Sequence, residues 1–215
     1  MLIDALVLAG GRSSRLGSVA KAKLKYRNQT LLERTVAAVA GLRFTVVVGD
    51  TAEQALPVQI LVTREDPPFG GPAAGIGAGL ARLTAVDPIA SDYTIVLACD
   101  MPNIGAAVPL LLSSLAKEDG LIDDGPTADT NGDGFIAVDS RHHLQPLAAA
   151  YRTTALLDAV ARQQRVGSLS GLSVFQLIRG LSLSEITVPD EATSDVDTWA
   201  DAEAWGIEHP PSGAV

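Results

Sequence analysis

Apolar runs of strand length alternate with segments of helical periodicity over the first half of the chain. Strands are predicted for residues 3–9 (IDALVLA), 44–48 (FTVVV), 59–63 (QILVT) and 93–98 (YTIVLA). Helices are predicted over residues 30–39, 72–83 and 106–116, from their periodicity and their end signals. This alternation predicts an α/β fold with a mainly parallel sheet, covered by helices on both faces.

Two of these helices carry recognisable start signals. Thr30 and Glu33 have the spacing of a capping box, in which each side chain accepts a hydrogen bond from a backbone N–H of the first turn,. Pro72 suits the start of a helix, because its missing N–H would have no partner there. Glycines at positions 75, 77 and 79 weaken this second prediction, since glycine lowers helix propensity.

The second half of the chain is less regular. Residues 118–134 are rich in glycine and aspartate, which predicts a long loop,. Strands are predicted at 136–138 and 147–151, helices at 155–163 and 172–181, and a last short helix from Thr198, with Asp201 completing its start signal,. No repeat or linker divides the chain, so we expect one domain over residues 1–208 and a flexible tail over 209–215.

Charge is distributed unevenly along the chain. The 215 residues hold 16 basic and 25 acidic side chains, a net charge of −9. Residues 1–50 hold eight basic and three acidic residues, net +5, and the remainder holds eight and 22, net −14. An acidic chain argues against nucleic acid or an anionic membrane as partner. The local basic cluster instead suggests a small anionic ligand.

The cysteine count and the N-terminal sequence indicate a cellular compartment. A single cysteine, Cys99, excludes an internal disulfide and fits a reducing environment. The N-terminal residues lack the pattern of a signal peptide. No apolar stretch is long enough to cross a bilayer, so we expect a cytoplasmic protein.

The glycine-containing segment after the first strand is the leading candidate for ligand binding. It reads LAGGRSSRLG over residues 8–17, and six basic residues without any acid lie between Arg12 and Arg27. Glycine lets backbone N–H groups approach an anion, and basic side chains neutralise phosphate charge. The segment has neither of the common nucleotide-loop patterns. It therefore indicates a triphosphate or pyrophosphate loop of another kind, the alternative being an ordinary surface turn.

Acidic residues near later strand ends form a second group of candidates. Asp100 follows the strand 93–98, at the sheet edge where ligands bind, and suits a divalent cation or a helix N-cap. Asp66 lies in a Pro/Gly loop, where it accepts hydrogen bonds from a base or ribose or is exposed to solvent. Asp195 and Asp197 alternate, so their side chains point the same way on extended chain. Either completes a metal site or caps a helix.

Three other features have weaker functional interpretations. Residues 129–134 match the first half of a calcium loop, but Ser140 stands where a glutamate ligand is required,. His142 and His143 lack partners at metal-ligand spacing, and we expect them to line a substrate pocket beside Gln145 or to be exposed. Cys99 has no activating partner, which favours a packed side chain over a nucleophile.

Five ordered motifs together resemble the molybdenum cofactor guanylyltransferase family: LAGGRSSRLG with Lys21, EDPPFGGPAAG, LACDMP, QPL-x-x-x-Y and DVDTWAD. They follow the family's order and span nearly the whole chain. The resemblance implies a three-layer α/β/α sandwich with a mostly parallel sheet, the Rossmann-like nucleotidyltransferase fold of sugar-nucleotide pyrophosphorylases. The implied reaction joins the GMP half of GTP to the terminal phosphate of molybdenum-bound molybdopterin, with Mg²⁺, and releases pyrophosphate.

The resemblance also implies roles for the matching residues. Those implied to bind the nucleotide are Leu8, Ala9, Gly10, Gly11, Arg12, Lys21, Asp66 and Asp100. Those implied to act in catalysis are Arg15, Lys21 and Asp100, and those facing the acceptor are Gln145, Pro146, Asp195 and Asp197. Asp100 and Asp197 are the expected metal ligands. Positioning and charge neutralisation would supply the catalysis, without a protein nucleophile.

Several positions depart from the family pattern. Ala20 replaces an aspartate before the lysine, Arg27-Asn28 replaces a glycine pair, Leu16 replaces a methionine, and residues 118–134 resemble an insertion. The missing carboxylate leaves open a cytidylyl- or other nucleotidyltransferase with a different base or acceptor, or a nucleotide-binding relative without turnover. LAGG rather than LAAG at residues 8–11 favours guanine. The expected partners are GTP and a molybdopterin-type phosphorylated acceptor, and contact with proteins that deliver or receive the molybdenum cofactor is left open.

Overall fold

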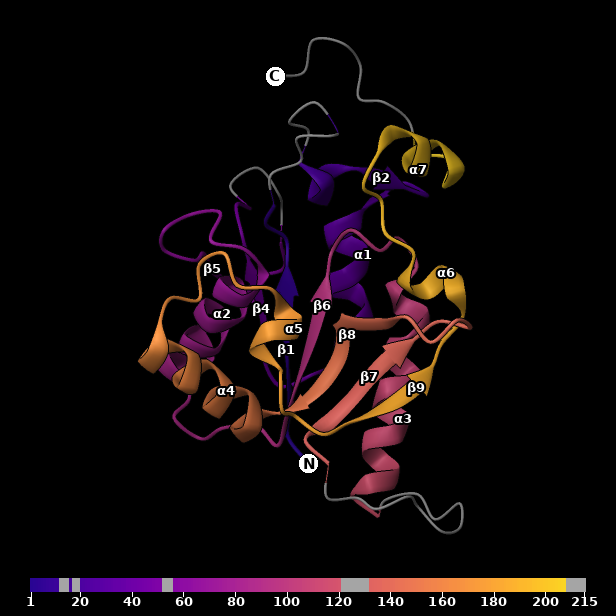
Figure 1. Cartoon of the computed structure of the whole chain (residues 1–215). Helices are drawn as coiled ribbons and strands as arrows, with labels where there is room; N and C mark the ends of the chain where they lie inside the picture. The colour runs from indigo at the N-terminus through magenta and orange to yellow at the C-terminus, as the bar shows by residue number, and fades with distance from the viewer. Residues whose placement is uncertain (12–15, 17–19, 52–55, 121–131, 208–215) are drawn as a thin grey trace.

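A seven-stranded sheet forms the middle layer of the protein. The computed structural model describes residues 1–11, 16, 20–51, 56–120 and 132–207, and its strand order is β5-β4-β1-β6-β8-β7-β9 (Figure 1). The strands are β1 (Ile3–Leu8), β4 (Thr45–Val48), β5 (Leu61–Thr63), β6 (Tyr93–Ala98), β7 (Gly134–Val138), β8 (Leu144–Arg152) and β9 (Leu183–Thr187). A separate hairpin pairs β2 (Lys25–Tyr26) with β3 (Gln29–Thr30).

The four strands of the first half of the chain form the parallel part of the sheet. β1 pairs in parallel with β4 and β6, and β4 pairs in parallel with β5. β6 is buried along its whole length, as expected for a parallel strand covered on both faces. All four predicted strands are confirmed, with bounds that differ by at most two residues.

The other three strands are arranged differently. β8 is antiparallel to both β6 and β7, whereas β7 is parallel to β9. The prediction of a mostly parallel sheet is therefore confirmed, with two antiparallel pairings in its second half. β9 was not predicted, because it is an edge strand whose sequence, LSEIT, is half polar and only partly buried.

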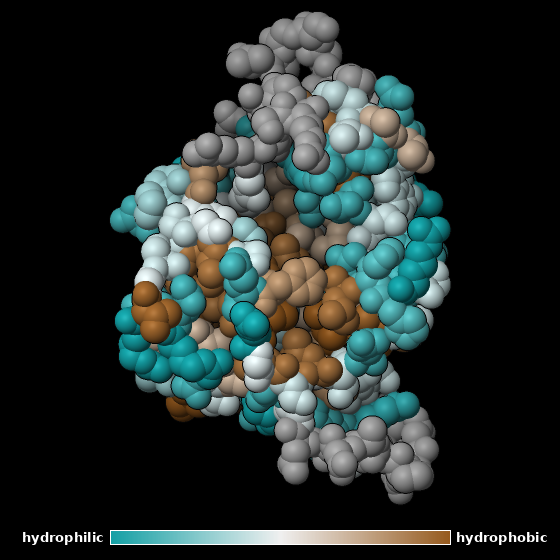
Figure 2. Space-filling model, in the orientation of Figure 1, coloured by the Kyte–Doolittle hydropathy of each residue, from teal (hydrophilic) through white to brown (hydrophobic). Residues whose placement is uncertain are grey.

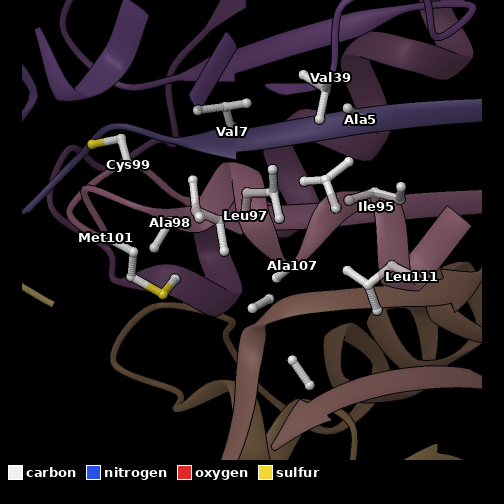
Figure 3. Close-up of a cluster of buried hydrophobic side chains, with 14 of the residues drawn as sticks. Ala5, Val7, Val39, Ile95, Leu97, Ala98, Cys99, Met101, Ala107 and Leu111 are labelled. Atoms are coloured by element: carbon white, nitrogen blue, oxygen red, sulfur yellow. The ribbon is translucent and has the colours of Figure 1, made fainter. Parts of the chain in front are cut away.

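Helices cover both faces of the sheet, which confirms the three-layer architecture (Figure 1). On one face, α2 (Pro72–Val86), α4 (Thr153–Val166) and α5 (Val174–Leu177) pack with side chains of the sheet in one core cluster. On the other face lie α1 (Leu31–Ala38), α3 (Val108–Glu118) and α6 (Asp190–Thr193). Figure 3 shows part of this second core, where Ile95 and Leu97 of β6 lie near Ala107 and Leu111.

Glycines bring α2 close to the sheet. A Cβ added at Gly79 would lie 2.8 Å from Cδ2 of Leu6, and one at Gly75 would lie 3.4 Å from Cδ2 of Leu8. Leu6 and Leu8 belong to β1, which lies inside the sheet between β4 and β6. The glycines therefore serve close helix–sheet packing here, and the helix runs three residues beyond its predicted end.

Three predictions about helices have different outcomes. The capping box of Thr30 and Glu33 is confirmed, with both reciprocal hydrogen bonds present. The predicted helix 172–181 is wrong outside Val174–Leu177, because its capping box begins at Ser173 and Gly180 adopts a positive φ of 92° soon after its end. A short helix does follow Thr198, namely α7 (Trp199–Ala204), and Thr198 and Asp201 form its capping box.

A third, smaller core lies beside the main sheet. It joins α7 and the β2–β3 hairpin, and its buried members are Leu16, Leu24, Tyr26, Leu31, Val196, Ala202 and Ile207. None of the helices in the described part of the chain has the length and apolar composition needed to span a bilayer. Most of the predicted loop 118–134, and the tail 209–215, lie outside the described residues.

Candidate functional site

A cavity of about 460 Å³ opens where β1, β4 and β6 end. Figure 2 shows a recess near the centre of this face, with hydrophobic atoms inside it. Carboxyl ends of neighbouring strands in an open α/β sheet form the usual ligand crevice. The lining residues are Leu8, Ala9, Gly10, Gly11, Ala20, Lys21, Val48, Glu65, Phe69, Gly71, Pro72, Gly75, Ala98, Cys99, Asp100, Met101, Gln145, Pro146, Leu147, Thr193 and Asp195.

The turn after β1 forms one wall of the cavity. The N–H of Ala9 donates to the carbonyl of Val48 at 2.8 Å, which keeps the turn beside β4. Gly49 follows β4 with a φ of 145°, and a Cβ there would lie 2.9 Å from the backbone nitrogen of Gly10. Only glycine allows this approach. Gly10 and Gly11 in the turn are exposed. The predicted phosphate ligands Arg12 and Arg15 lie outside the described residues.

A buried carboxylate lies on the same side of the cavity. Glu65 follows β5 and is 9% exposed, and its Oε1 accepts a hydrogen bond from the N–H of Phe69 at 3.0 Å. Among the residues that the structure describes, no donor is recorded for its Oε2. Asp66, the predicted nucleoside contact, is exposed and does not line the cavity. The carboxylate that faces the cavity is thus one position earlier than the residue singled out from the sequence.

Ionic side chains gather at another part of the cavity. The ammonium of Lys21 donates to Oδ2 of Asp100 at 2.9 Å and also to Oδ1 of Asp197. Burial alone would lower the pKa of Lys21, but the charge of Asp100 and hydrogen bonds with Asp197 and Asp100 outweigh burial and raise it. Lys21 therefore stays protonated between two carboxylates.

The backbone explains how these three side chains meet. Lys21 begins a 3-10 helix, Lys21–Lys23, whose Ala22 is buried against the main core. The N–H of Val196 donates to the carbonyl of Asp100 at 2.9 Å, so the segment before α7 is tied to the end of β6. Thr198 and Asp201 satisfy the start of α7. This resolves the cap alternative for Asp197, whose carboxylate instead faces Lys21.

Three carboxylates at this place form a potential metal-binding group. One oxygen each of Asp100, Asp195 and Asp197 lies within 4.8 Å of the others. Burial and the negative charges of Asp197 and Asp100 raise the pKa of Asp195. Hard divalent cations such as Mg²⁺ prefer carboxylate oxygen ligands, so the donor set fits such an ion. Asp195, predicted to face the acceptor, here joins the two predicted metal ligands.

An irregularity in β8 supplies the remaining wall. Ile136 of β7 pairs with Ala149 of β8, but the next residue, Ala137, pairs with Gln145. The intervening residues of β8 therefore bulge out of the ladder. The bulge places Gln145, Pro146 and Leu147 along the cavity. That Gln145 and Pro146 face the acceptor stays a prediction.

The structure thus brings together most of the predicted site residues. Those lining the cavity are Leu8, Ala9, Gly10, Gly11, Lys21, Asp100, Gln145, Pro146 and Asp195, and Asp197 contacts Lys21. Glu65, Phe69 and Thr193 also line it but were missed. A signal for Glu65 was available, because it follows a predicted strand almost directly.

The two histidines lie away from the cavity, and Cys99 is a packed side chain at its edge. His142 and His143 are exposed; their Nδ1 atoms lie 3.0 Å from Glu185 and 2.8 Å from Asp139, respectively. They do not line the cavity, which supports the exposed alternative. Cys99 is buried at the cavity edge, and burial raises the pKa of its thiol, as expected for a packed side chain.

Comparison of the sequence with those of known proteins identifies its family. The sequence profile of the MobA-like NTP transferase domain matches residues 5–176. A probable molybdenum cofactor guanylyltransferase from Clostridium perfringens is 31% identical over 149 residues, which cover 69% of this chain and 65% of that protein. Another from Chloroflexus aggregans is 33% identical over 163 residues, covering 73% and 68%. The match thus spans just under two thirds of the Clostridium protein.

Two crystal structures have a similar fold. Molybdopterin-guanine dinucleotide biosynthesis protein A from Archaeoglobus fulgidus has a TM-score of 0.63 at 20% identity, over 94% of this chain and 96% of that chain. The 2-C-methyl-D-erythritol 4-phosphate cytidylyltransferase of Francisella tularensis has a TM-score of 0.69 at 12% identity, over 96% and 99%. These likenesses confirm the predicted Rossmann-like nucleotidyltransferase fold.

Proposed function

Since the chain belongs to the MobA-like NTP transferase domain family, we propose that it is a guanylyltransferase that modifies a molybdopterin-type acceptor. The observation that carries the proposal is a single cavity that joins the glycine turn, Lys21 with Asp100, and the bulge of β8. An oxygen of the acceptor's terminal phosphate would attack the α-phosphorus of GTP. The bond from that phosphorus to the β-phosphate oxygen would break, and pyrophosphate would leave.

The ionic group suits this chemistry without a protein nucleophile. Charge on the phosphoryl oxygens changes during in-line displacement, so fixed positive groups and correct positioning supply most of the catalysis. Lys21 is the described cation that lines the cavity. Its ammonium would neutralise charge near the α-phosphate, while exposed N–H groups at Gly10 and Gly11 would approach the phosphates.

We propose Mg²⁺ as the cation held by the carboxylates. Asp100 and Asp197 would hold it, and Asp195 lies close enough to take part. When bound, it would neutralise charge on the triphosphate and the leaving pyrophosphate. The ammonium of Lys21 pairs with Asp100 and Asp197, so it competes with a cation for these two carboxylates.

Glu65 supports guanine as the base. Guanine presents two adjacent donors, N1–H and the N2 amino group, which a carboxylate can accept together, whereas the pairing edge of cytosine presents one amino group. Glu65 lines the cavity, and guanine would give its carboxylate donors in addition to the N–H of Phe69. The family resemblance assigns the nucleoside contact to Asp66, but its exposed position makes Glu65 the better candidate.

A binding experiment tests the base assignment. In thermal-shift titrations with Mg²⁺, GTP should stabilise the chain more than ATP, CTP or UTP, because a ligand of the native state raises its melting temperature. Glu65→Gln should reduce the GTP preference at least about tenfold. Asp66→Asn, its matched control, should leave it unchanged. Stabilisation by CTP but not by GTP would contradict the guanylyl assignment. If only Asp66→Asn reduced the GTP preference, the nucleoside contact would be assigned to Asp66.

Turnover separates an enzyme from a binding protein. With GTP, Mg²⁺ and a molybdopterin-bearing acceptor, the chain should release pyrophosphate and form the dinucleotide. Asp100→Asn should reduce this release about 100-fold or more, and unchanged release would contradict the role given to Asp100. The alternative of a relative without turnover rests on Ala20 in place of a carboxylate. GTP binding without any pyrophosphate release would favour that alternative.

A further inference from the structure

The bulge of β8 has an internal support. The hydroxyl of Tyr151 donates a hydrogen bond to the carbonyl of Pro146 at 2.7 Å, across five positions of the same strand. Tyr151 is fully buried, in the core under α2, α4 and α5. Burial raises the pKa of its phenol, so the hydroxyl keeps its proton and remains a donor.

The hydrogen bond compensates for what the bulge removes. Between the pairs Ile136–Ala149 and Ala137–Gln145, the residues of β8 have no partner on β7. A strand carbonyl that loses its ladder partner in a partly buried place needs another donor. Pro146 has no N–H to lose, which suits it to a bulge, and the Tyr151 hydroxyl serves its carbonyl. Phenylalanine would fill the same space but leave this carbonyl without the donor.

Gln145, Pro146 and Leu147 line the cavity on the side of β1 opposite to Glu65, which follows β5. β8 is separated from β1 by β6, and from β5 by three strands. Gln145 and Leu147 line the cavity on either side of the braced Pro146. Their placement therefore depends on a hydroxyl that does not itself line the cavity.

We propose that Tyr151 is a positioning residue for the acceptor: its hydroxyl holds Gln145, Pro146 and Leu147 in the place where the acceptor body binds. This inference rests on the proposed transferase function, because it assigns the β8 wall to the second substrate. Removing the hydroxyl lets the bulge shift while the glycine turn, Glu65 and Lys21 keep their places. The effect should therefore fall on the acceptor and spare GTP.

Tyr151→Phe tests the proposal, with Tyr93→Phe as a matched control. Tyr93 is also buried, and its hydroxyl accepts a hydrogen bond from Arg152 at 2.7 Å, but it lies at the start of β6, away from the cavity. In steady-state assays of pyrophosphate release, Tyr151→Phe should raise KM for the acceptor about tenfold, with kcat and KM for GTP within about twofold. Tyr93→Phe should change neither KM beyond about twofold.

Amide hydrogen exchange provides a second measurement that needs no acceptor. Leu147 and Ala148 should exchange at least about tenfold faster in Tyr151→Phe than in the unchanged chain, and Tyr93→Phe should not alter them. Unchanged exchange rates in Tyr151→Phe would contradict the proposed role of the Tyr151 hydroxyl. So would an equal rise in KM for the acceptor and for GTP. If the unchanged chain releases no pyrophosphate with any acceptor, the proposed function falls while the exchange rates still decide whether Tyr151 holds the bulge.

Discussion

The two halves of the central sheet differ in regularity and in what they bring to the cavity. The half formed by β5, β4, β1 and β6 is parallel, and its strands β1 and β6 are almost entirely buried. The half formed by β8, β7 and β9 has antiparallel pairings, a register shift and a partly exposed edge. The regular half supplies the glycine turn, Glu65 and Asp100, and the irregular half supplies Gln145, Pro146 and Leu147.

The difference indicates two ways of placing functional groups. Apolar packing on both faces fixes the strand ends of the parallel half, so a nucleotide would meet a preformed wall. In the second half, polar contacts add to apolar packing on both faces. Examples are the hydrogen bond of Tyr151 to Pro146 and the bonds of Ser140 to Asp190. The ion pairs of Lys21 cross the boundary, because Asp100 follows β6 and Asp197 follows β9 and α6.

The largest predicted effect separates the packing of the two halves. Leu6 of β1 is fully buried under α2, whereas Leu183 of β9 is only partly buried. Leu6→Ala should lower the free energy of unfolding by about 2–5 kcal/mol, and Leu183→Ala by about 1 kcal/mol. Urea unfolding followed by circular dichroism measures both. Equal losses would show that the edge strand is packed as firmly as the centre of the sheet.

Lys21→Met tests the ion pairs across the boundary. The variant should release pyrophosphate about 100-fold more slowly, about 2.7 kcal/mol in the barrier, because a fixed positive group is missing. In the absence of nucleotide, it should bind Mn²⁺ on the order of tenfold more tightly, since Lys21 no longer competes for Asp100 and Asp197,. Paramagnetic resonance titration of free Mn²⁺ measures this affinity.

Lys23→Met is the control for this experiment. Lys23 lies on the same 3-10 helix, but it is exposed and does not line the cavity. The substitution removes the same charge and should leave both the rate and the Mn²⁺ affinity within about twofold. If Lys21→Met weakened Mn²⁺ binding instead, Lys21 would be organising the carboxylates rather than competing with the cation.

The parallel half could be predicted from the sequence, for a physical reason. Strands buried on both faces are near-continuous apolar runs, and the runs at β1 and β6 have the length and composition of such strands. Their strand ends then locate the ligand crevice. Lys21 and Asp100 could be proposed on that basis, from the basic segment and the carboxylate that follow these strands.

The irregular half could be predicted only in part, because long-range contacts shape it. β9 is stabilised by pairing with β7 rather than by its own pattern. The bulge of β8 depends on the Tyr151 hydroxyl and on its pairing partners. The choice between Glu65 and Asp66 turns on where β5 ends, which pattern alone locates to within a few residues. The contact of Lys21 with Asp197 joins residues 176 positions apart, and no local sequence pattern predicts it.

A smaller effect is expected from the link between the β7–β8 turn and α6. Both the N–H and the hydroxyl of Ser140 donate to the carboxylate of Asp190, at 2.8 and 2.9 Å. α6 leads directly to Asp195 and Asp197. Ser140→Ala removes one of the two bonds and should weaken Mn²⁺ binding about threefold, about 0.7 kcal/mol. Ser184 is an exposed serine of β9, and Ser184→Ala should leave Mn²⁺ binding unchanged. If both variants weakened Mn²⁺ binding equally, the link of Ser140 to α6 would not position the carboxylates.

The smallest predicted effect concerns acid stability of the irregular half. A hydrogen bond from the backbone N–H of His143 lowers the pKa of Asp139, assisted by the His143 side chain and the N–H of Arg141. A carboxyl whose pKa is lower in the folded chain stabilises it above the unfolded value, about 3.9, and this contribution disappears as the pH falls through the folded value. Asp139→Asn should therefore lower the urea midpoint at pH 7 and progressively less towards pH 3.

The exposed Asp158 of α4 is the control, and Asp158→Asn should change the midpoint little at either pH. If the Asp139→Asn difference were constant with pH, the β7–β8 turn would owe its stability to packing, as the parallel half does.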